Sequence, residues 1–200
     1  MTVFTFDETH TLHFEAGHPE RPERLEAVRA RLEAAGLWDE RRRLPTPEAS
    51  DEALGRVHPQ AYLDLLDEVA AAGGAALQPD TFARAGSVAL AKRAVGGLLG
   101  ATDAVLSGEA DRAFALTRPP GHHARPFEAM GFCLYANVAL AVEHARVVHG
   151  IERALVVDFD VHHGNGTQEV FYADPDVLVV TSQQYPLWPG TGGIAETGVG

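Results

Sequence analysis

Cysteine is nearly absent from this chain of 200 residues, which contains only Cys133. A single cysteine excludes an internal disulfide and any zinc site built from clustered cysteines. Apolar runs long enough to cross a bilayer are also lacking, and the N-terminus has no signal-peptide pattern. We therefore expect a cytoplasmic protein that has no membrane partner.

Basic residues are scarce as well, because 16 Lys and Arg stand against 28 Asp and Glu, for a formal net charge of −12. Phosphate binding needs clustered Lys and Arg, so this charge argues against nucleic acid as a direct partner. It favours cationic substrates, although only through long-range steering. The hydrophobic fraction of 46% is ordinary for a folded domain, and the length suffices for one sizeable core.

Short apolar runs alternate with helical patterns along the chain. Strands are predicted at residues 2–6, 113–117, 154–159 and 177–181, and helices at 22–35, 58–72, 87–106, 133–148 and 168–172. This order predicts a three-layer α/β/α fold, in which helices cover both faces of a mainly parallel sheet. The glycine-rich segment from Trp188 to Gly200 has no final packed element. We therefore expect one domain over residues 1–200 that is incomplete at its C-terminus.

The most informative stretch follows the apolar run at residues 154–157. Asp158, Asp160 and His162 occupy alternate positions in it, so on a strand they would all point to one side. Two carboxylates at the end of a buried strand are costly to desolvate, and a divalent metal such as zinc removes that cost. A hydrogen-bonded polar cluster at the strand end is the alternative interpretation.

A second strand end carries two adjacent imidazoles, His122 and His123, directly after the rigid turn Arg118-Pro119-Pro120-Gly121. Imidazole is suited to proton transfer near neutral pH. Two surface histidines in a loop are the alternative. Open α/β sheets place their active sites at the carboxyl ends of the strands, which favours a site shared by both loops.

Together these segments resemble the histone deacetylase superfamily, which includes acetylpolyamine amidohydrolases and acetoin-utilisation proteins. The resemblance rests on residues 18–25 (HPERPERL), 118–124, 131–133, 158–167 and 188–192. The Arg-Pro-Pro-Gly turn and Asn165 are typical of the class II branch and its bacterial relatives. The resemblance implies an arginase/deacetylase-like fold. It also implies an amidohydrolase that removes acetyl or similar acyl groups from lysine side chains, polyamines or small amines.

The resemblance implies zinc as the cofactor, with one ion per active site, and it allows a structural monovalent cation. Asp160 and His162 match two of the three zinc ligands of the family. The third ligand, an aspartate, and a tyrosine or histidine that stabilises the oxyanion lie in the C-terminal part of the family domain. No residue here matches them, so we expect these 200 residues alone to be nearly inactive and a longer chain to be active.

Four further residues match the proton-transfer groups of the family. His123 matches the general base, and His122 matches the neighbour that steadies charge and passes a proton to the leaving amine. Asp158 resembles the carboxylate bonded to His122, and Asn165 occupies the place of the partner of His123. Because an amide is neutral, Asn165 should raise the basicity of His123 less than a carboxylate would.

Substrate contacts are implied at five positions. Phe132 and Trp188 match the aromatic walls of a narrow channel, and the Gly131 carbonyl resembles an acceptor for the substrate amide. Arg24 resembles an arginine that lines an inner pocket, and Asp80 corresponds to a carboxylate at the rim. The natural substrate and the oligomeric state are left open by the sequence.

Two other functions compete with the deacetylase interpretation. The first is an inactive fragment or pseudoenzyme that binds acyl-amine ligands or a protein partner, because the third metal ligand and the oxyanion donor are missing. The second is a two-manganese ureohydrolase on a related fold. That reading is disfavoured because such sites need more aspartate ligands than the loop at 158–163 offers.

Overall fold

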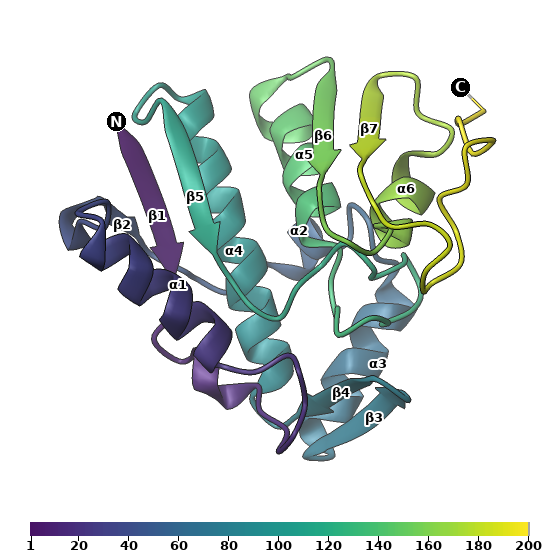
Figure 1. The fold of residues 1–200 in the computed structure, drawn as a ribbon, viewed down its shortest axis with the longest axis horizontal. Coiled ribbons are helices and arrows are strands. Elements are labelled where there is room, and N and C mark those ends of the chain that lie inside the picture. The colour runs from purple at the N-terminus through teal and green to yellow at the C-terminus, as the bar shows by residue number, and fades with distance from the viewer. Residues whose placement is uncertain (200) are drawn as a thin grey trace.

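The computed structural model describes residues 1–199, so Gly200, the last residue of the glycine-rich segment, lies outside the described residues. Strands and helices alternate along most of the chain (Figure 1). The strands are β1 (Thr2–Phe6), β2 (Arg43–Leu44), β3 (Gly74–Gln78), β4 (Thr81–Arg84), β5 (Arg112–Leu116), β6 (Ala154–Asp158) and β7 (Val177–Thr181). The α-helices are α1 (Glu23–Ala34), α2 (Asp51–Leu54), α3 (Gln60–Ala71), α4 (Ser87–Leu106), α5 (Asn137–His149) and α6 (Asn165–Phe171).

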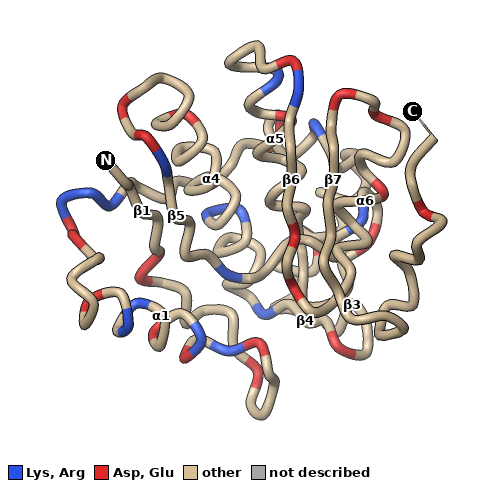
Figure 2. The backbone as a smooth tube through the Cα atoms, turned by 45° about the horizontal axis from the view of Figure 1, so that its top comes forward, with Lys and Arg blue, Asp and Glu red and all other residues tan. Residues whose placement is uncertain are grey.

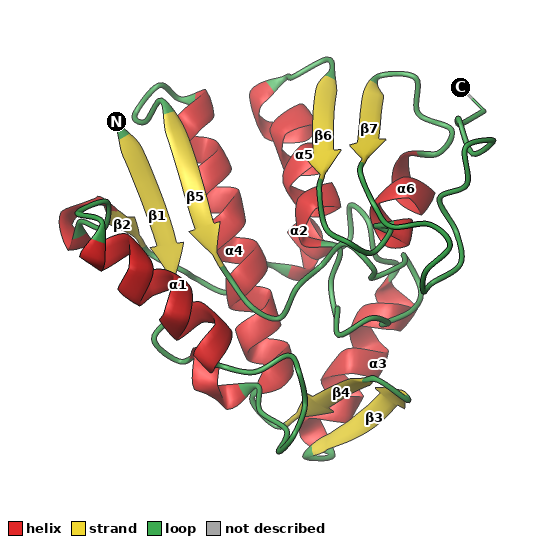
Figure 3. Cartoon of the chain, viewed as in Figure 1, coloured by secondary structure: helices red, strands yellow, loops and turns green. Residues whose placement is uncertain are grey.

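Five of the strands pair in parallel, which confirms the predicted α/β class. β1 lies between β2 and β5, and Phe4 stands opposite both Arg43 and Phe114. β6 pairs with β7, and the antiparallel hairpin of β3 and β4 lies apart from both groups (Figure 3). β5 and β6 point the same way in Figure 3, so the loops that follow them leave from the same edge.

Helices enclose β1 and β5 from both sides. Leu25 of α1 packs with Phe6 and Leu116, and α4 lies against the opposite face, where Ala104 clusters with Val3. Residues of both charge signs occur along α1 (Figure 2). This half of the molecule therefore has the predicted three layers.

Only one face of β6 and β7 is covered in the part of the chain that the structure describes. Val156 and Val179 pack into a cluster that also contains residues of α5 and α6. The alternate positions, which point to the opposite face, are 45–63% exposed: Leu155, Val157, Leu178 and Val180. Within residues 1–199, the expectation that helices cover both faces is thus wrong for these two strands.

None of the helices between residues 1 and 199 combines the length and the apolar character that a membrane span requires.

Glycines allow α4 to approach the segment that follows β2. A Cβ atom added to Gly96 would lie 1.9 Å from the Pro47 carbonyl oxygen, and one added to Gly97 would lie 2.7 Å from Thr46 Cγ2. Any larger residue would push the helix away. Glycine at these two positions therefore permits the close packing of α4.

Two predicted helices begin at other residues in the structure. α5 begins at Asn137 rather than at residue 133, since the Cys133 amide donates to the Met130 carbonyl and the Ala136 amide donates to His58 Nε2. α6 begins at Asn165, three residues before the predicted start.

The elements that were not predicted include the short helix α2, the edge strand β2 and the hairpin of β3 and β4. The hairpin strands contain Gly, Ala and Gln, which have low strand propensity.

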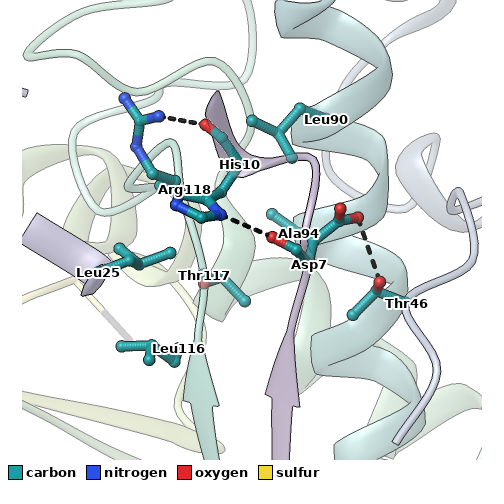
Figure 4. A pocket seen from close by; sticks show the side chains of 9 residues that line it. All are labelled: Asp7, His10, Leu25, Thr46, Leu90, Ala94, Leu116, Thr117 and Arg118. Atoms are coloured by element: carbon teal, nitrogen blue, oxygen red, sulfur yellow. Dashed lines mark hydrogen bonds between the residues drawn. The ribbon is translucent and has the colours of Figure 1, made fainter. Parts of the chain in front are cut away.

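A buried ion pair joins the segment before α1 to the loop after β5. Arg118 Nε and Nη2 donate to the Glu20 carboxylate at 2.9 and 2.6 Å, and the two side chains are at most 1% exposed. Arg118 also donates to the His10 carbonyl, at the edge of a cavity of about 10 Å³ (Figure 4). That volume fits one water molecule.

Glu20→Gln should lower the free energy of unfolding by about 3–5 kcal/mol, because it leaves the Arg118 charge buried without its counter-ion. Arg24→Gln is the matched control, since the Arg24 side chain is 55% exposed and lies 3.8 Å from the same carboxylate. That control should cost less than about 1 kcal/mol. Urea unfolding measures both values, and equal losses would contradict the assignment of the buried pair.

Candidate functional site

The chain turns sharply where β6 ends. The Asp160 amide donates to Asp158 Oδ1 at 3.1 Å, and the His162 amide donates to Asp160 Oδ1 at 2.8 Å. Bonds of this kind, from a side chain to the amide two residues on, form Asx turns and end the strand at Asp158. The prediction that strand alternation carries Asp160 and His162 to the side of Asp158 is therefore wrong, because both residues lie beyond the strand.

The turn nevertheless brings Asp160 and His162 together. Asp160 Oδ1 and His162 Nδ1 are 3.2 Å apart, and the two side chains are 49% and 41% exposed. Two ligands of one tetrahedral zinc ion, each about 2.0–2.1 Å from the metal, lie about 3.3 Å from each other. The spacing and the donor types of this pair therefore fit two ligands of one zinc ion.

His122 lies beside this turn and is bonded to Asp158. His122 Nδ1 donates to Asp158 Oδ2 at 2.9 Å, which fixes the orientation of the ring. Burial alone would raise the pKa of Asp158, but the bonds from His122 and from the Asp160 amide outweigh it and hold that pKa below its usual value. Asp158 is therefore ionised near neutral pH.

His123 is 3% exposed and is bonded to a neutral partner. Its Nδ1 donates to Asn165 Oδ1 at 2.9 Å, which leaves Nε2 with a free lone pair. Burial, followed by the proximity of His122, lowers the pKa of His123 to about 4, against a smaller opposing effect of Asn165. His123 is therefore a neutral imidazole that can accept a proton, 3.9 Å from the His122 ring, centre to centre.

Backbone contacts hold the loop after β5 against the first turn of α6. The amides of Gly166 and Thr167 donate to the His122 carbonyl at 3.0 and 3.2 Å. A Cβ atom on Gly164 would lie 2.3 Å from Asp158 Oδ2, so the loop after β6 can pass this close only as glycine. The structure thus brings His122, His123, Asp158 and Asn165 into one cluster.

Gly131 and Phe132 form an unusual turn against this cluster. Both have positive φ angles, 55° and 70°. A Cβ atom on Gly131 would lie 2.4 Å from His123 Cδ2 and 2.6 Å from Trp188, so no larger residue fits. The Phe132 amide donates to Thr81 Oγ1 at 3.0 Å, which fixes the turn to the start of β4.

Two aromatic side chains, Trp188 and Phe132, contact histidine rings in this region. The Trp188 ring lies 4.7 Å from the His123 ring and 6.0 Å from the His162 ring, centre to centre. The Phe132 ring contacts His18 at 4.7 Å, and His18 Nε2 donates to the Asp80 carbonyl at 3.1 Å. Trp188 therefore lies against the cluster, whereas Asp80 is connected to Phe132 only through His18. The roles of all three residues toward a substrate stay predictions.

Arg24 lies apart from these groups. Its side chain is on α1, is 55% exposed and lies 3.8 Å from the Glu20 carboxylate. The arginine that is buried on the same carboxylate is Arg118. A pocket-lining role for Arg24 stays a prediction.

Several residues that support the site were not identified from the sequence. Thr81 holds the Phe132 amide, and no sequence signal pointed to it. His18 supports Phe132, and its place in the HPERPERL motif could have revealed it. His163 is 2% exposed, accepts from the Thr191 hydroxyl at 2.8 Å and donates to Gln168 Oε1 at 2.9 Å. It thereby anchors the glycine-rich loop that carries Trp188.

Gly131→Ala should destabilise the fold by about 1–3 kcal/mol and displace the His123 ring, because its methyl group overlaps that ring. The control is Gly100→Ala in α4, where a Cβ atom meets nothing within 4 Å and should stabilise the helix by about 0.5–1 kcal/mol. Thermal unfolding and the imidazole NMR signals of His123 measure the effects. An unchanged His123 signal in Gly131→Ala would contradict the close contact.

This chain is similar to known proteins over most of its length. A protein-family model described as the histone deacetylase domain matches residues 18–200. A histone deacetylase-like amidohydrolase of Pseudomonas aeruginosa is 46% identical over 174 residues, covering 87% of this chain and 46% of that protein. A probable deacetylase of Methanothermobacter thermautotrophicus is 40% identical, covering 99% of this chain and 59% of that protein. The human polyamine deacetylase HDAC10 is 43% identical, over 85% of this chain and 27% of that protein.

The fold is also similar to a solved structure, the crystal structure of the HDA15 HD domain. The TM-score is 0.94 at 38% sequence identity, and the match covers 100% of this chain and 59% of that chain. This chain thus spans about half the length of the first two relatives, 46% and 59%. With the family model matching from residue 18 onward, the chain belongs to the histone deacetylase domain family.

Proposed function

We propose that this chain carries the active-site residues of a zinc-dependent amidohydrolase that removes acetyl or similar acyl groups from amines. The observation that carries the proposal is the position of the Asp160–His162 pair beside a buried, neutral His123 with a free Nε2. A metal-ligand pair next to a base is the arrangement that metal-assisted amide hydrolysis requires.

Asp160 and His162 are the zinc ligands in this proposal. Bound zinc would polarise the substrate carbonyl and lower the pKa of a water molecule toward 7. His123 takes the proton of the attacking water at Nε2, because Asn165 holds the other ring nitrogen in its protonated form. The proton taken up by His123 passes to the leaving amine by way of His122 Nε2, while the Asp158 carboxylate accepts from Nδ1 and orients the ring.

The substrate class follows from the surroundings of this cluster and from the relatives. Phe132 and Trp188 supply flat apolar surfaces suited to a thin alkyl stem, and the Gly131 carbonyl can accept the amide proton of the substrate. Relatives named amidohydrolase and polyamine deacetylase support acylated lysine, polyamine or small-amine substrates. Their names do not favour the alternative of an inactive binding protein.

We further propose that residues 1–200 belong to one deacetylase-like domain. Support comes from the family match over residues 18–200 and from the solved structure that covers the whole chain.

His123→Ala should lower the turnover of an acetyl-lysine peptide by about 100- to 10,000-fold and leave the zinc content unchanged, because it removes a base and no ligand. Asp160→Ala and His162→Ala should lower both zinc content and turnover. Zinc content is measured by metal analysis and turnover by a deacetylation assay. Both use a longer, zinc-loaded protein that includes residues 1–200. Loss of zinc from His123→Ala, or full zinc in both ligand variants, would overturn the assignments.

Phe132→Ala should raise KM for acyl-lysine peptides and change kcat little, since the ring contacts the substrate stem in the ground state and the transition state alike. Phe127→Ala is the matched control, because Phe127 lies in the same connection and its side chain is 72% exposed. Steady-state kinetics on one peptide series separates the two variants. Equal KM values for both would remove Phe132 from the substrate wall.

A further inference from the structure

A second cluster of metal-binding side chains lies on two helices. Asp103 of α4 faces His144 and His149 of α5, and Asp103 Oδ1 is 2.6 and 2.7 Å from the two Nε2 atoms. One nitrogen or oxygen atom from each of the three residues lies within 4.8 Å of the others. Within residues 1–199 this is the one His, Cys, Asp and Glu group of three that meets that distance.

The cluster is distant from the proposed active site. Asp103 and His149 lie in the last turns of α4 and α5, and these helices lead into the starts of β5 and β6. The cluster therefore lies at the amino-terminal edge of the strands, whereas His122 and Asp160 follow their carboxyl ends (Figure 1). Helix carboxyl ends carry partial negative charge, so two of them together favour a cation.

Burial and donor chemistry indicate the kind of ion. The side chains of His144 and His149 are 11% and 21% exposed, and that of Asp103 is 47% exposed. The imidazoles are thus held between the helices while the carboxylate is open to solvent, which leaves room for water ligands. Two imidazoles and one carboxylate suit zinc and neighbouring divalent transition metals, and disfavour magnesium or calcium.

We propose that Asp103, His144 and His149 form a second metal site, for a zinc-like divalent transition metal. Without metal, both Nε2–H groups donate to Asp103. On binding, each Nε2 gives up its proton and coordinates the metal with its lone pair, and that proton moves to Nδ1 of the same ring. Asp103 exchanges two hydrogen bonds for one metal bond.

Arg56 opposes this exchange. Its Nη1 lies 2.8 Å from His144 Nδ1, and because a guanidinium only donates, His144 must hold its proton on Nε2. Metal binding needs the reverse tautomer, so Arg56 must withdraw. Arg56 also lies 3.9 Å from Glu52, whose side chain is 89% exposed. The guanidinium can therefore move toward solvent and keep this acidic partner. Arg56 therefore sets the affinity of the site.

Cobalt(II) titration of the purified protein, followed by absorption and calorimetry, tests the proposal. The unmodified protein should bind one equivalent that both His149→Gln and Asp103→Asn remove. Arg56→Gln should bind it about 10-fold more tightly, because glutamine can accept the Nδ1 proton. Asp174→Asn is the matched control, since Asp174 pairs with Arg146 of α5 outside the cluster and should leave binding unchanged.

Asp160→Ala separates the two sites, because it removes the proposed catalytic ligand and should leave this equivalent bound. Thermal unfolding of each variant without metal verifies that it folds. Cobalt binding that is unaffected by both His149→Gln and Asp103→Asn would overturn the proposal, as would weaker binding in Arg56→Gln. Neither result would bear on the function proposed for His123 and Asp160.

Discussion

Two side-chain hydrogen bonds, from the loop after β5 to the end of β6 and to the start of α6, hold the candidate site together. His122 donates to Asp158 and His123 donates to Asn165, each at 2.9 Å. Because one acceptor is a carboxylate and the other a neutral amide, two adjacent imidazoles are placed in different electrostatic surroundings. Neighbouring titratable groups with different environments are how an active site assigns different proton-transfer roles.

A buried ion pair and two glycines position the residues that form these two hydrogen bonds. The buried pair of Arg118 and Glu20 ties the start of the loop after β5 to the segment before α1. A Cβ atom added to Gly131 would lie 2.4 Å from His123, and one added to Gly164 would lie 2.3 Å from Asp158. Only glycine fits at these two positions. Precise placement of the imidazoles therefore depends on residues that take no part in proton transfer.

Sequence patterns predicted much of this arrangement, because strand ends in a parallel sheet follow from simple periodicity. The apolar runs located β1, β5, β6 and β7, and the carboxyl-end rule brought the two loops together. The mutual position of Asp160 and His162 could not be predicted from strand alternation, because two Asx turns set it. The Thr81 contact depends on an unpredicted hairpin, and the start of α5 depends on a hydrogen bond that the Ala136 amide donates to His58, 78 residues away.

The cluster of Asp103, His144 and His149 could not be predicted from the sequence either, because it also depends on contacts between distant segments. Its residues are 41 and 46 positions apart in sequence and meet only because α4 and α5 pack side by side. Spacing within one helix gives no hint of it, since positions five apart are not neighbours on a helix face. Long-range helix packing thus creates chemistry that local patterns do not contain.

Anomalous diffraction at the zinc absorption edge, from crystals of the protein grown with zinc, tests the central claim most directly. The account predicts a peak shared by Asp160 Oδ1 and His162 Nδ1, on the side of these residues that faces His123. A map that has no peak beside Asp160 and His162, although zinc fully occupies another site in the molecule, would contradict it.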